Sequence, residues 1–288
     1  MTVLERKIGF IGAGNMAEAM INGMIISGVS KKNQIIASDV SDKRRRYMEE
    51  RYSIETTNEN SRVIAECRTV FLAVKPQQMN SLLSEISAII SSLITEKKII
   101  VSIAAGISLS RIEGYLYSAI EPAQLERLPI IRAMPNTPAL VQAGITGLAG
   151  NAHATEQDLA DIRQMLEGVG KVVFFNETQM DSVTAVSGSG PAYLFYFVEA
   201  LVDAGISIGL MESDSLLLVT ETIKGAMSLL EKTGEQAEGL RKKVTSPGGT
   251  TEAACTLLDS HEFKKIIGNA VKAAARRSKE LSAAVDLP

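Results

Sequence analysis

Short apolar runs rich in β-branched residues alternate with amphipathic segments through residues 7–175 of this 288-residue chain. The apolar runs predict strands at residues 7–11, 34–38, 70–74, 98–103, 130–133, 145–148 and 171–175. Between most of them, apolar side chains recur with a helical period and predict helices at residues 15–26, 42–51, 78–92, 108–118 and 155–167. This alternation is typical of a parallel sheet covered by helices on both faces.

From residue 179 onward the helical period continues almost without strand signals. It predicts helices at residues 191–206, 213–230, 235–244, 250–258 and 262–281. The chain is also longer than a typical single domain. We therefore predict an α/β fold in two domains, an N-terminal Rossmann doubly wound sheet at residues 1–176 and an all-α C-terminal domain at residues 177–288.

The predicted helix at residues 191–201 is apolar on nearly every face, with the sequence PAYLFYFVEAL. Such a helix must be buried on all sides. A C-terminal domain of about 110 residues is too small to surround it. We therefore expect a second subunit to cover part of it in an interlocked homodimer. A monomeric bundle with one central helix is the alternative.

The first apolar run leads directly into the pattern G-x-G-x-x-A, formed by Gly12, Gly14 and Ala17. The first glycine permits a tight turn out of a strand, and the second lets the backbone approach a pyrophosphate. The small third residue allows close helix packing, and the helix N-terminus offers N–H groups to the anion. This pattern predicts a dinucleotide site, with a purely structural strand–turn–helix as the alternative.

Two further segments follow predicted strands, at the edge where open α/β sheets bind ligands. Pro76 disfavours helix at Lys75 and turns the chain outward over the crevice. We expect Lys75 either to contact a phosphate or carboxylate or to be a solvated loop lysine. The small residues at positions 102–106 would admit a flat nicotinamide or ribose, although they also suit ordinary packing.

Three loops supply other candidate groups. Asn136 lies between two prolines in a segment that cannot be helical, where it would orient a carboxamide or the substrate or form an Asx turn. In the second half, the glycine-rich segments at residues 187–192 and 246–251 each open a predicted helix, with Pro191 in a first turn and Thr250 or Thr251 as N-cap. Two such N-termini could present N–H groups to one carboxylate.

Composition excludes several classes of function. The net charge of −3 comes from 30 basic and 33 acidic residues that are interspersed, so neither a nucleic-acid groove nor a membrane surface is expected. The two cysteines are far apart, and no signal peptide or membrane span is evident, which predicts a cytoplasmic protein. Neither histidine sits in a motif, so we expect no metal and no histidine relay. A cofactor must then supply most of the chemistry.

The chain resembles the pyrroline-5-carboxylate reductase family in five segments, FIGAGNMA, LAVKP, RAMPNTPA, DSVTAVSGSGPAY and VTSPGGTT, in this order and spacing. The resemblance extends from about residue 7 to 281. It implies that NADPH or NADH reduces the cyclic imine 1-pyrroline-5-carboxylate to L-proline, the last step of proline biosynthesis. It also implies a Rossmann domain, a helical dimerisation domain and a homodimer or higher homo-oligomer.

The resemblance also implies positions for the ligands. The catalytic residue would be Thr251, whose hydroxyl would hydrogen-bond the ring nitrogen as hydride reaches the neighbouring carbon. The substrate would contact Asn136, Ser189, Gly190, Gly248, Gly249, Thr250 and Thr251. The cofactor would contact Ile11, Gly12, Ala13, Gly14, Asn15, Met16, Ser38, Asp39, Asn60, Ala73, Val74, Lys75, Pro76, Ala104, Ala105 and Gly106.

The choice between NADH and NADPH stays open at this point. Family members that bind NADPH often carry an Asn-Arg pair after the second strand, where this chain has Ser38 and Asp39. An acidic residue there would accept the ribose 2′-OH of NADH and repel a 2′-phosphate. Conversely, Ser38, Lys43 and Arg44 could partly accommodate the phosphate, and Asp39 could be only a turn residue.

Two competing functions remain. A β-hydroxyacid dehydrogenase shares the Rossmann-plus-helical plan, but it needs a lysine early in the helical domain, and residues 186–203 contain none. A dinucleotide sensor without catalysis would bind the cofactor and leave the glycine-rich segments at residues 187–192 and 246–251 without a role.

Overall fold

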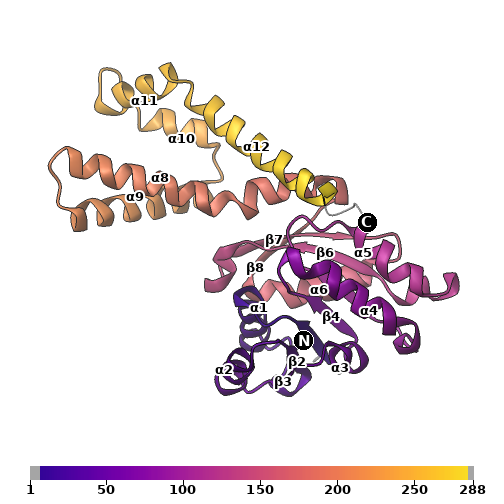
Figure 1. The fold of residues 1–288 in the computed structure, drawn as a ribbon. Helices are drawn as coiled ribbons and strands as arrows, with labels where there is room; N and C mark the ends of the chain where they lie inside the picture. The colour runs from indigo at the N-terminus through magenta and orange to yellow at the C-terminus, as the bar shows by residue number, and fades with distance from the viewer. Residues whose placement is uncertain (1–6, 285–288) are drawn as a thin grey trace. The chain divides into compact units, whose positions relative to one another are not determined.

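A computed structural model describes residues 7–284 of the chain, and its first part is an eight-stranded sheet (Figure 1). The strand order is β3-β2-β1-β4-β5-β6-β7-β8. The strands are β1 (Ile8–Ile11), β2 (Ile35–Ser38), β3 (Glu55–Thr57), β4 (Thr69–Leu72), β5 (Ile99–Ser102), β6 (Ile130–Met134), β7 (Gly144–Gly150) and β8 (Gly170–Phe174). All neighbouring strands are parallel except β6 and β7, which are antiparallel.

The antiparallel pair corrects the expectation of a wholly parallel sheet. Residues 135–143 connect β6 to β7 through a short 3₁₀ turn, whereas a parallel return needs a crossover of a dozen or more residues. The sequence patterns also missed β3 and helix α3 (Asn60–Glu66). Strand β3 has only three residues, all polar and half-buried, so it carries no apolar run. Helix α3 is too short for a clear period.

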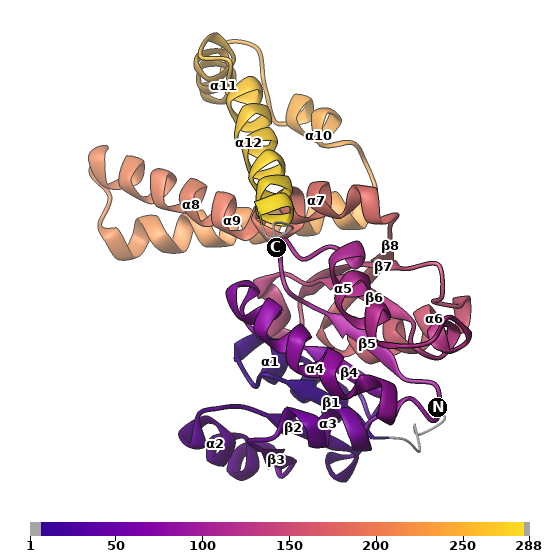
Figure 2. The same cartoon turned by 45° about the vertical axis from the view of Figure 1, so that its right-hand side comes forward.

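Two helical layers cover the sheet, as Figures 1 and 2 show in two views that differ by a turn. On one face α1 (Asn15–Ile26), α2 (Asp42–Tyr52) and α6 (Glu156–Leu166) pack around the stacked rings of Phe10 and Phe71, whose centroids are 4.7 Å apart. On the other face α3, α4 (Met79–Leu93) and α5 (Leu109–Leu116) pack against alternate strand residues such as Ile11 and Ile36. Because successive strand side chains point to opposite faces, buried strands with apolar residues at every position support both layers.

The second half is helical, as predicted. It contains α7 (Met180–Val183), a π-helical segment (Thr184–Gly188), α8 (Gly190–Ser207), α9 (Glu212–Thr233), α10 (Ala237–Lys243), α11 (Thr250–Ser260) and α12 (Phe263–Ala284). Short 3₁₀ turns occur at Lys32–Gln34, Pro76–Gln78, Tyr117–Ala119, Pro122–Arg127, Thr137–Val141, Glu167–Val169 and Glu177–Gln179. Between residues 7 and 284, no helix has the combination of length and apolar character that crossing a membrane requires.

The chain divides into two compact units, which do not follow the chain in simple order. Within the described residues, one unit runs from residue 7 to Ser189 and includes residues 274–284, and the other is Gly190–Ala273. The end of α12 therefore belongs with the sheet, where Ser278 Oγ donates to Asp181 Oδ1 at 2.7 Å. The domain division at residue 176 stays a prediction.

Candidate active site

A cavity of about 490 Å³, which we call the Gly-loop cavity, lies where β1, β2 and β4 end. This is the edge of the sheet at which open α/β folds bind ligands. Nine of the predicted cofactor residues line it, namely Ile11, Gly12, Gly14, Ser38, Asp39, Asn60, Ala73, Val74 and Lys75. The fold thus brings together four segments, at residues 11–14, 38–39, 60 and 73–75, that are far apart in sequence.

The glycine loop has the backbone that a bound pyrophosphate needs. Gly12 has φ +93°, and a Cβ there would lie 2.7 Å from the carbonyl oxygen of Ala73, so both the turn and the close approach require glycine. A Cβ on Gly14 would meet nothing within 4 Å, which leaves space beside the backbone. Helix α1 begins at Asn15 with Gly14 as its N-cap and no side-chain cap. The residues present therefore fit a dinucleotide phosphate at a helix N-terminus.

Asp39 is held in place by four hydrogen bonds. Its carboxylate accepts the N–H of Ala13 at 3.0 Å and the N–H of Ser41 at 2.9 Å. Its own N–H donates to the carbonyl of Thr57 at 3.2 Å, and its carbonyl accepts from Arg45 at 2.6 Å. The half-buried carboxylate therefore has a fixed position on the wall of the cavity.

Asn60 is the centre of a second polar chain in the cavity wall. Its Oδ1 accepts from Ser38 Oγ at 2.7 Å, and its Nδ2 donates to Glu85 at 3.1 Å. These bonds link the end of β2 to α3 and α4, so Asn60 has a positioning function besides any contact with a ligand.

The sequence patterns missed six lining residues, which are Val40, Gln77, Gln78, Ser81, Leu82 and Glu85. The last four recur at i, i+3, i+4 and i+7, which is one face of a helix. That spacing directly after Pro76 was the available signal. The spacing alone does not show which face of α4 points to the cavity.

Seven predicted cofactor residues do not line this cavity. Ala13, Asn15 and Met16 lie in the glycine loop or at the start of α1, and Pro76 begins a 3₁₀ turn. Ala104 is buried, and Ala105 packs beside Met134, Met180 and Val183. Gly106 faces α12, since a Cβ on it would lie 3.1 Å from Leu281. The small residues after β5 therefore serve packing here, and their contact with a cofactor stays a prediction.

Asn136 is 9% exposed, and its Oδ1 accepts the N–H of Ile145 at 2.9 Å. The bond spans nine residues, so it holds β7 in place and is not the local Asx turn that we considered. Its contact with the substrate stays a prediction.

The segment at residues 187–192 differs from the expected glycine-rich loop. The chain passes from α7 through the π-helical Thr184–Gly188 into α8, and Pro191 is the second residue of α8 as expected. The N–H of Ser189 donates to the carbonyl of Thr184 at 2.8 Å, so this N–H is engaged within the helix. π-Helical turns are rare in proteins overall, and those that occur are often found at functional sites.

The segment at residues 246–251 forms a turn that opens α11. Gly248 has φ +72°, and its N–H donates to the carboxylate of Glu252 at 2.7 Å. The N-cap is Gly249, which corrects the expectation of Thr250 or Thr251, because Thr250 is already the first helical residue. The turn thus binds a carboxylate oxygen from its own helix, while half-buried Thr251 lies in the first turn.

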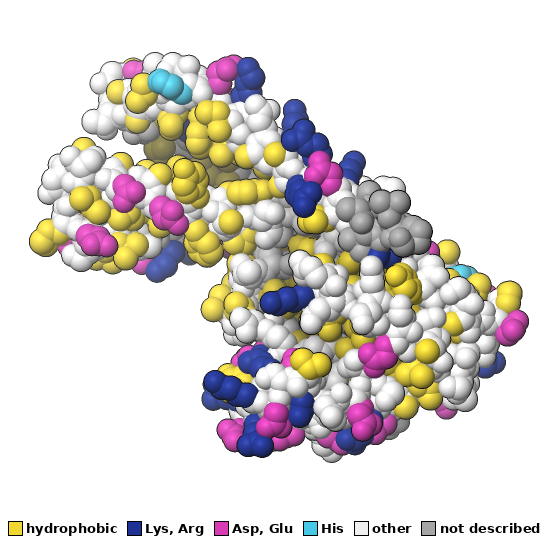
Figure 3. All heavy atoms as spheres, viewed as in Figure 1, with side chains coloured by type: hydrophobic (Ala, Val, Ile, Leu, Met, Phe, Trp, Pro, Cys, Tyr) yellow, Lys and Arg dark blue, Asp and Glu magenta, His cyan; other side chains and the backbone are white. Residues whose placement is uncertain are grey.

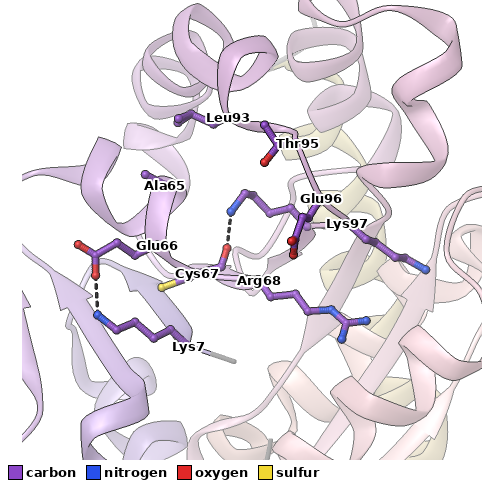
Figure 4. A pocket seen from close by; sticks show the side chains of 10 residues that line it. Lys7, Ala65, Glu66, Cys67, Arg68, Leu93, Thr95, Glu96 and Lys97 are labelled. Atoms are coloured by element: carbon purple, nitrogen blue, oxygen red, sulfur yellow. Dashed lines mark hydrogen bonds and ion pairs between the residues drawn. The ribbon is translucent and has the colours of Figure 1, made fainter. Parts of the chain in front are cut away.

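A second cavity, of about 400 Å³, lies at the opposite edge of the sheet, where β1, β4 and β5 begin (Figure 4). Lys7 is paired with Glu66 at 2.5 Å, and buried Lys98 donates to the carbonyl of Cys67. In Figure 4, Lys97 and Arg68 extend to one side and Lys7 lies with Glu66 on the other, so the cations do not converge on one point. Burial also raises the pKa of Cys67 to about 12, which keeps the thiol protonated.

Across residues 7–284, no three His, Cys, Asp or Glu side chains are grouped so that they could hold a metal ion. The positions that we consider for cofactor and substrate are the Gly-loop cavity and the start of α11.

Comparison with known proteins identifies the family. A model described as pyrroline-5-carboxylate reductase dimerisation matches residues 177–281, and one described as NADP oxidoreductase, coenzyme F420-dependent, matches residues 7–106. Pyrroline-5-carboxylate reductase from Arabidopsis thaliana is 39% identical over 276 residues, which cover 96% of this chain and 95% of the relative.

Two solved structures agree over the same length. A pyrroline-5-carboxylate reductase from Coxiella burnetii is 36% identical with a TM-score of 0.85, over 96% of this chain and 98% of the other. A pyrroline carboxylate reductase from Plasmodium falciparum with NADP bound is 30% identical with a TM-score of 0.84, over 98% of this chain and 100% of the other. The chain therefore belongs to the pyrroline-5-carboxylate reductase family.

Proposed function

We propose that this protein reduces 1-pyrroline-5-carboxylate to L-proline with NADPH or NADH, as the last step of proline biosynthesis. The cavity beside Gly14, at the N-terminus of α1, is the observation that most directly supports a dinucleotide-dependent reaction. The substrate is proposed from the relatives, whose names specify pyrroline-5-carboxylate.

We propose that the phosphates of the cofactor lie against residues 12–16, and that the predicted residues of β2, α3 and the segment 73–76 surround its adenosine half. Bound NAD(P)H supplies the hydride for the C=N bond. Lys75 is the only basic residue among those that line the cavity, which favours the phosphate-binding alternative over a solvated loop lysine.

For the substrate, we propose that its carboxylate binds N–H groups at Ser189, Gly190 and residues 248–251. The bond from Gly248 to Glu252 supports this, because it shows that a carboxylate oxygen suits the turn. The N–H groups of Thr250 and Thr251 are in the first turn of α11, where no intrahelical acceptor exists. Three of the proposed N–H groups have an intramolecular acceptor in the free chain, so binding would require Ser189 to leave Thr184, Gly248 to leave Glu252 and Gly249 to leave Ser246.

Thr251 is the proposed catalytic residue. A protonated imine is already electrophilic, so orientation supplies most of the acceleration. Thr251 would hydrogen-bond the ring nitrogen while that atom gains the electron pair of the C=N bond.

Replacing Thr251 by alanine should lower kcat/KM for pyrroline-5-carboxylate by about 10- to 100-fold, which is one lost transition-state hydrogen bond of about 1.4 to 2.8 kcal/mol. Thr251→Ser should keep most of the activity, because it keeps the hydroxyl. The matched control is Thr256→Ala, an exposed threonine on the same helix. The kcat/KM of each of these three variants is measured by the steady-state oxidation of NADH and NADPH. A wild-type rate in Thr251→Ala would remove this role.

The same assay separates the proposal from its alternatives. A sensor would bind NAD(P)H and oxidise none of it when pyrroline-5-carboxylate is added. A β-hydroxyacid dehydrogenase would instead act on a hydroxy acid with NAD(P)⁺.

The helical half supports the proposal of a homodimer or higher homo-oligomer. No residue of α8 is buried within the single chain, and Phe195 and Tyr196 are 61% and 74% exposed. Figure 3 shows hydrophobic side chains gathered over the helices of this half. Apolar surface of this extent marks an interaction site.

Size-exclusion chromatography with light scattering should give a mass of at least twice 30.9 kDa. Phe195→Glu should shift the particle toward the monomer, because it places a charge on the apolar surface of α8. The control Ile26→Glu changes a residue of α1 that is 69% exposed and should leave the mass unchanged. A wild-type mass of 31 kDa would contradict the dimer.

We also propose the domain division at residues 1–176 and 177–288, with the second part forming the dimer. The proposed location is the cytoplasm. The partners are the small-molecule substrate and further copies of the chain, with neither nucleic acid nor membrane involved.

A further inference from the structure

Of the side chains that bear a charge and line the Gly-loop cavity, two are acidic and one is basic. They are Asp39, Glu85 and Lys75, so their formal charges sum to −1. A dinucleotide brings two phosphate charges that the glycine loop and the start of α1 can accept. NADPH brings a further phosphate monoester with a charge of about −1.5 to −2. The cavity has no second cationic lining residue to match it.

Arg44 is one of the two basic residues that we considered for such a phosphate, and its guanidinium is engaged elsewhere. Its guanidinium pairs with Glu18 at 2.5 Å, donates to the carbonyl of Ala13, and lies 5.0 Å from the ring centroid of Tyr47. Although burial alone would raise the pKa of Glu18, hydrogen bonds from Tyr52, Arg44 and Tyr47 hold it below its ordinary value, so Glu18 stays charged. Moving Arg44 to a phosphate would leave that carboxylate unpaired.

Arg45 and the loop after β2 are engaged in the same way. Arg45 donates to the carbonyl of Asp39 at 2.6 Å and pairs with Asp42 at 3.2 Å. The N–H of Ser41 donates to Asp39, and the hydroxyl of Ser41 caps α2 by accepting from Arg44 N. The N–H of Ser41 therefore stabilises the carboxylate of Asp39, and Arg45 is held by the Asp39 carbonyl and by Asp42.

We propose that Asp39 makes this protein prefer NADH over NADPH. Each carboxylate oxygen of Asp39 accepts one N–H and keeps a second lone pair for a ribose hydroxyl. The same fixed charge repels a 2′-phosphate, and Arg44 and Arg45 already have other partners. Because it concerns the cofactor of the proposed reductase, this inference rests on the proposed function, but its test does not need the substrate.

The test is isothermal titration calorimetry of the full-length protein with ADP-ribose and with its 2′-phosphorylated form. These probes contain the adenosine half without the nicotinamide. The wild-type protein should bind ADP-ribose about 10- to 100-fold more tightly. Asp39→Ser should reduce this ratio at least tenfold, and Asp39→Asn should reduce it while keeping an acceptor for the N–H of Ala13. The control is Glu50→Gln, an exposed acid on the neighbouring helix α2, which should keep the wild-type ratio.

Three results would overturn the inference. The wild-type protein could bind the 2′-phosphorylated probe equally or more tightly, both Asp39 variants could keep the wild-type ratio, or Glu50→Gln could lower it as much as they do. Circular dichroism checks that each variant is folded. A reductase assay with pyrroline-5-carboxylate is run separately. If the protein prefers ADP-ribose as expected but does not reduce pyrroline-5-carboxylate, only the proposed function is rejected. If it reduces pyrroline-5-carboxylate but binds the 2′-phosphorylated probe more tightly, only this inference is rejected.

Discussion

Gly14→Val should lower the affinity for NADH and NADPH by at least about 100-fold, equivalent to about 2.8 kcal/mol, while the fold stays intact. Gly14 has φ −65° and ψ −179°, which any residue adopts, and a Cβ there meets nothing within 4 Å. The folded protein therefore tolerates the side chain. The phosphates do not, because the valine would occupy the space that they need beside the start of α1.

Calorimetric titration with NADH and NADPH measures the loss, and thermal unfolding checks the fold. Gly114→Val is the control, since Gly114 is an exposed residue of α5 that does not line the cavity. Gly12→Ala should behave differently and lose stability as well, because its φ is +93° and its Cβ would collide with the backbone of Ala73. Wild-type affinity in Gly14→Val would show that the phosphates bind elsewhere.

Arg132→Met should lower the free energy of unfolding by about 3 kcal/mol, the low end of the range for a broken buried ion pair. Arg132 is 2% exposed on β6, donates to Glu177 at 2.8 Å and lies 3.8 Å from Asp181. Asp181 also accepts from Ser278 of α12. Without the guanidinium, two acidic side chains face one buried site, and the attachment of α12 to the sheet weakens. We expect a loss of unfolding free energy at the low end of that range because the side chain of Glu177 is 30% exposed, so water partly solvates its carboxylate.

Urea unfolding followed by circular dichroism measures this change. The control Arg163→Met breaks an ion pair on the surface of α6, with Glu167 at 2.7 Å, and should cost no more than about 0.5 kcal/mol. A loss in Arg132→Met no larger than in the control would contradict the buried-pair argument. The double variant Arg132→Met/Glu177→Leu should recover part of the loss, because it removes the unpaired carboxylate.

Much of the fold could be predicted from local pattern alone. Helix α1 begins and ends where its period and the following glycine predicted, and seven strands occur within a few residues of the predicted runs. These elements have strong local signals because each buries an apolar face or run. Strand β3 and helix α3 lack such signals, since their place depends on neighbours that complete the sheet and cover it.

The sequence alone determined the two-part plan, the glycine loop and the family, because these depend on periodicity and on motifs within short segments. Tertiary structure decided which predicted residues share a cavity, and it packs Ala105 beside α7 and Gly106 beside α12. It also decided how the charges near Asp39 are paired. The sequence shows three arginines after an aspartate, but only the folded chain places Glu18 against Arg44, because that contact joins α1 to α2 across 26 residues.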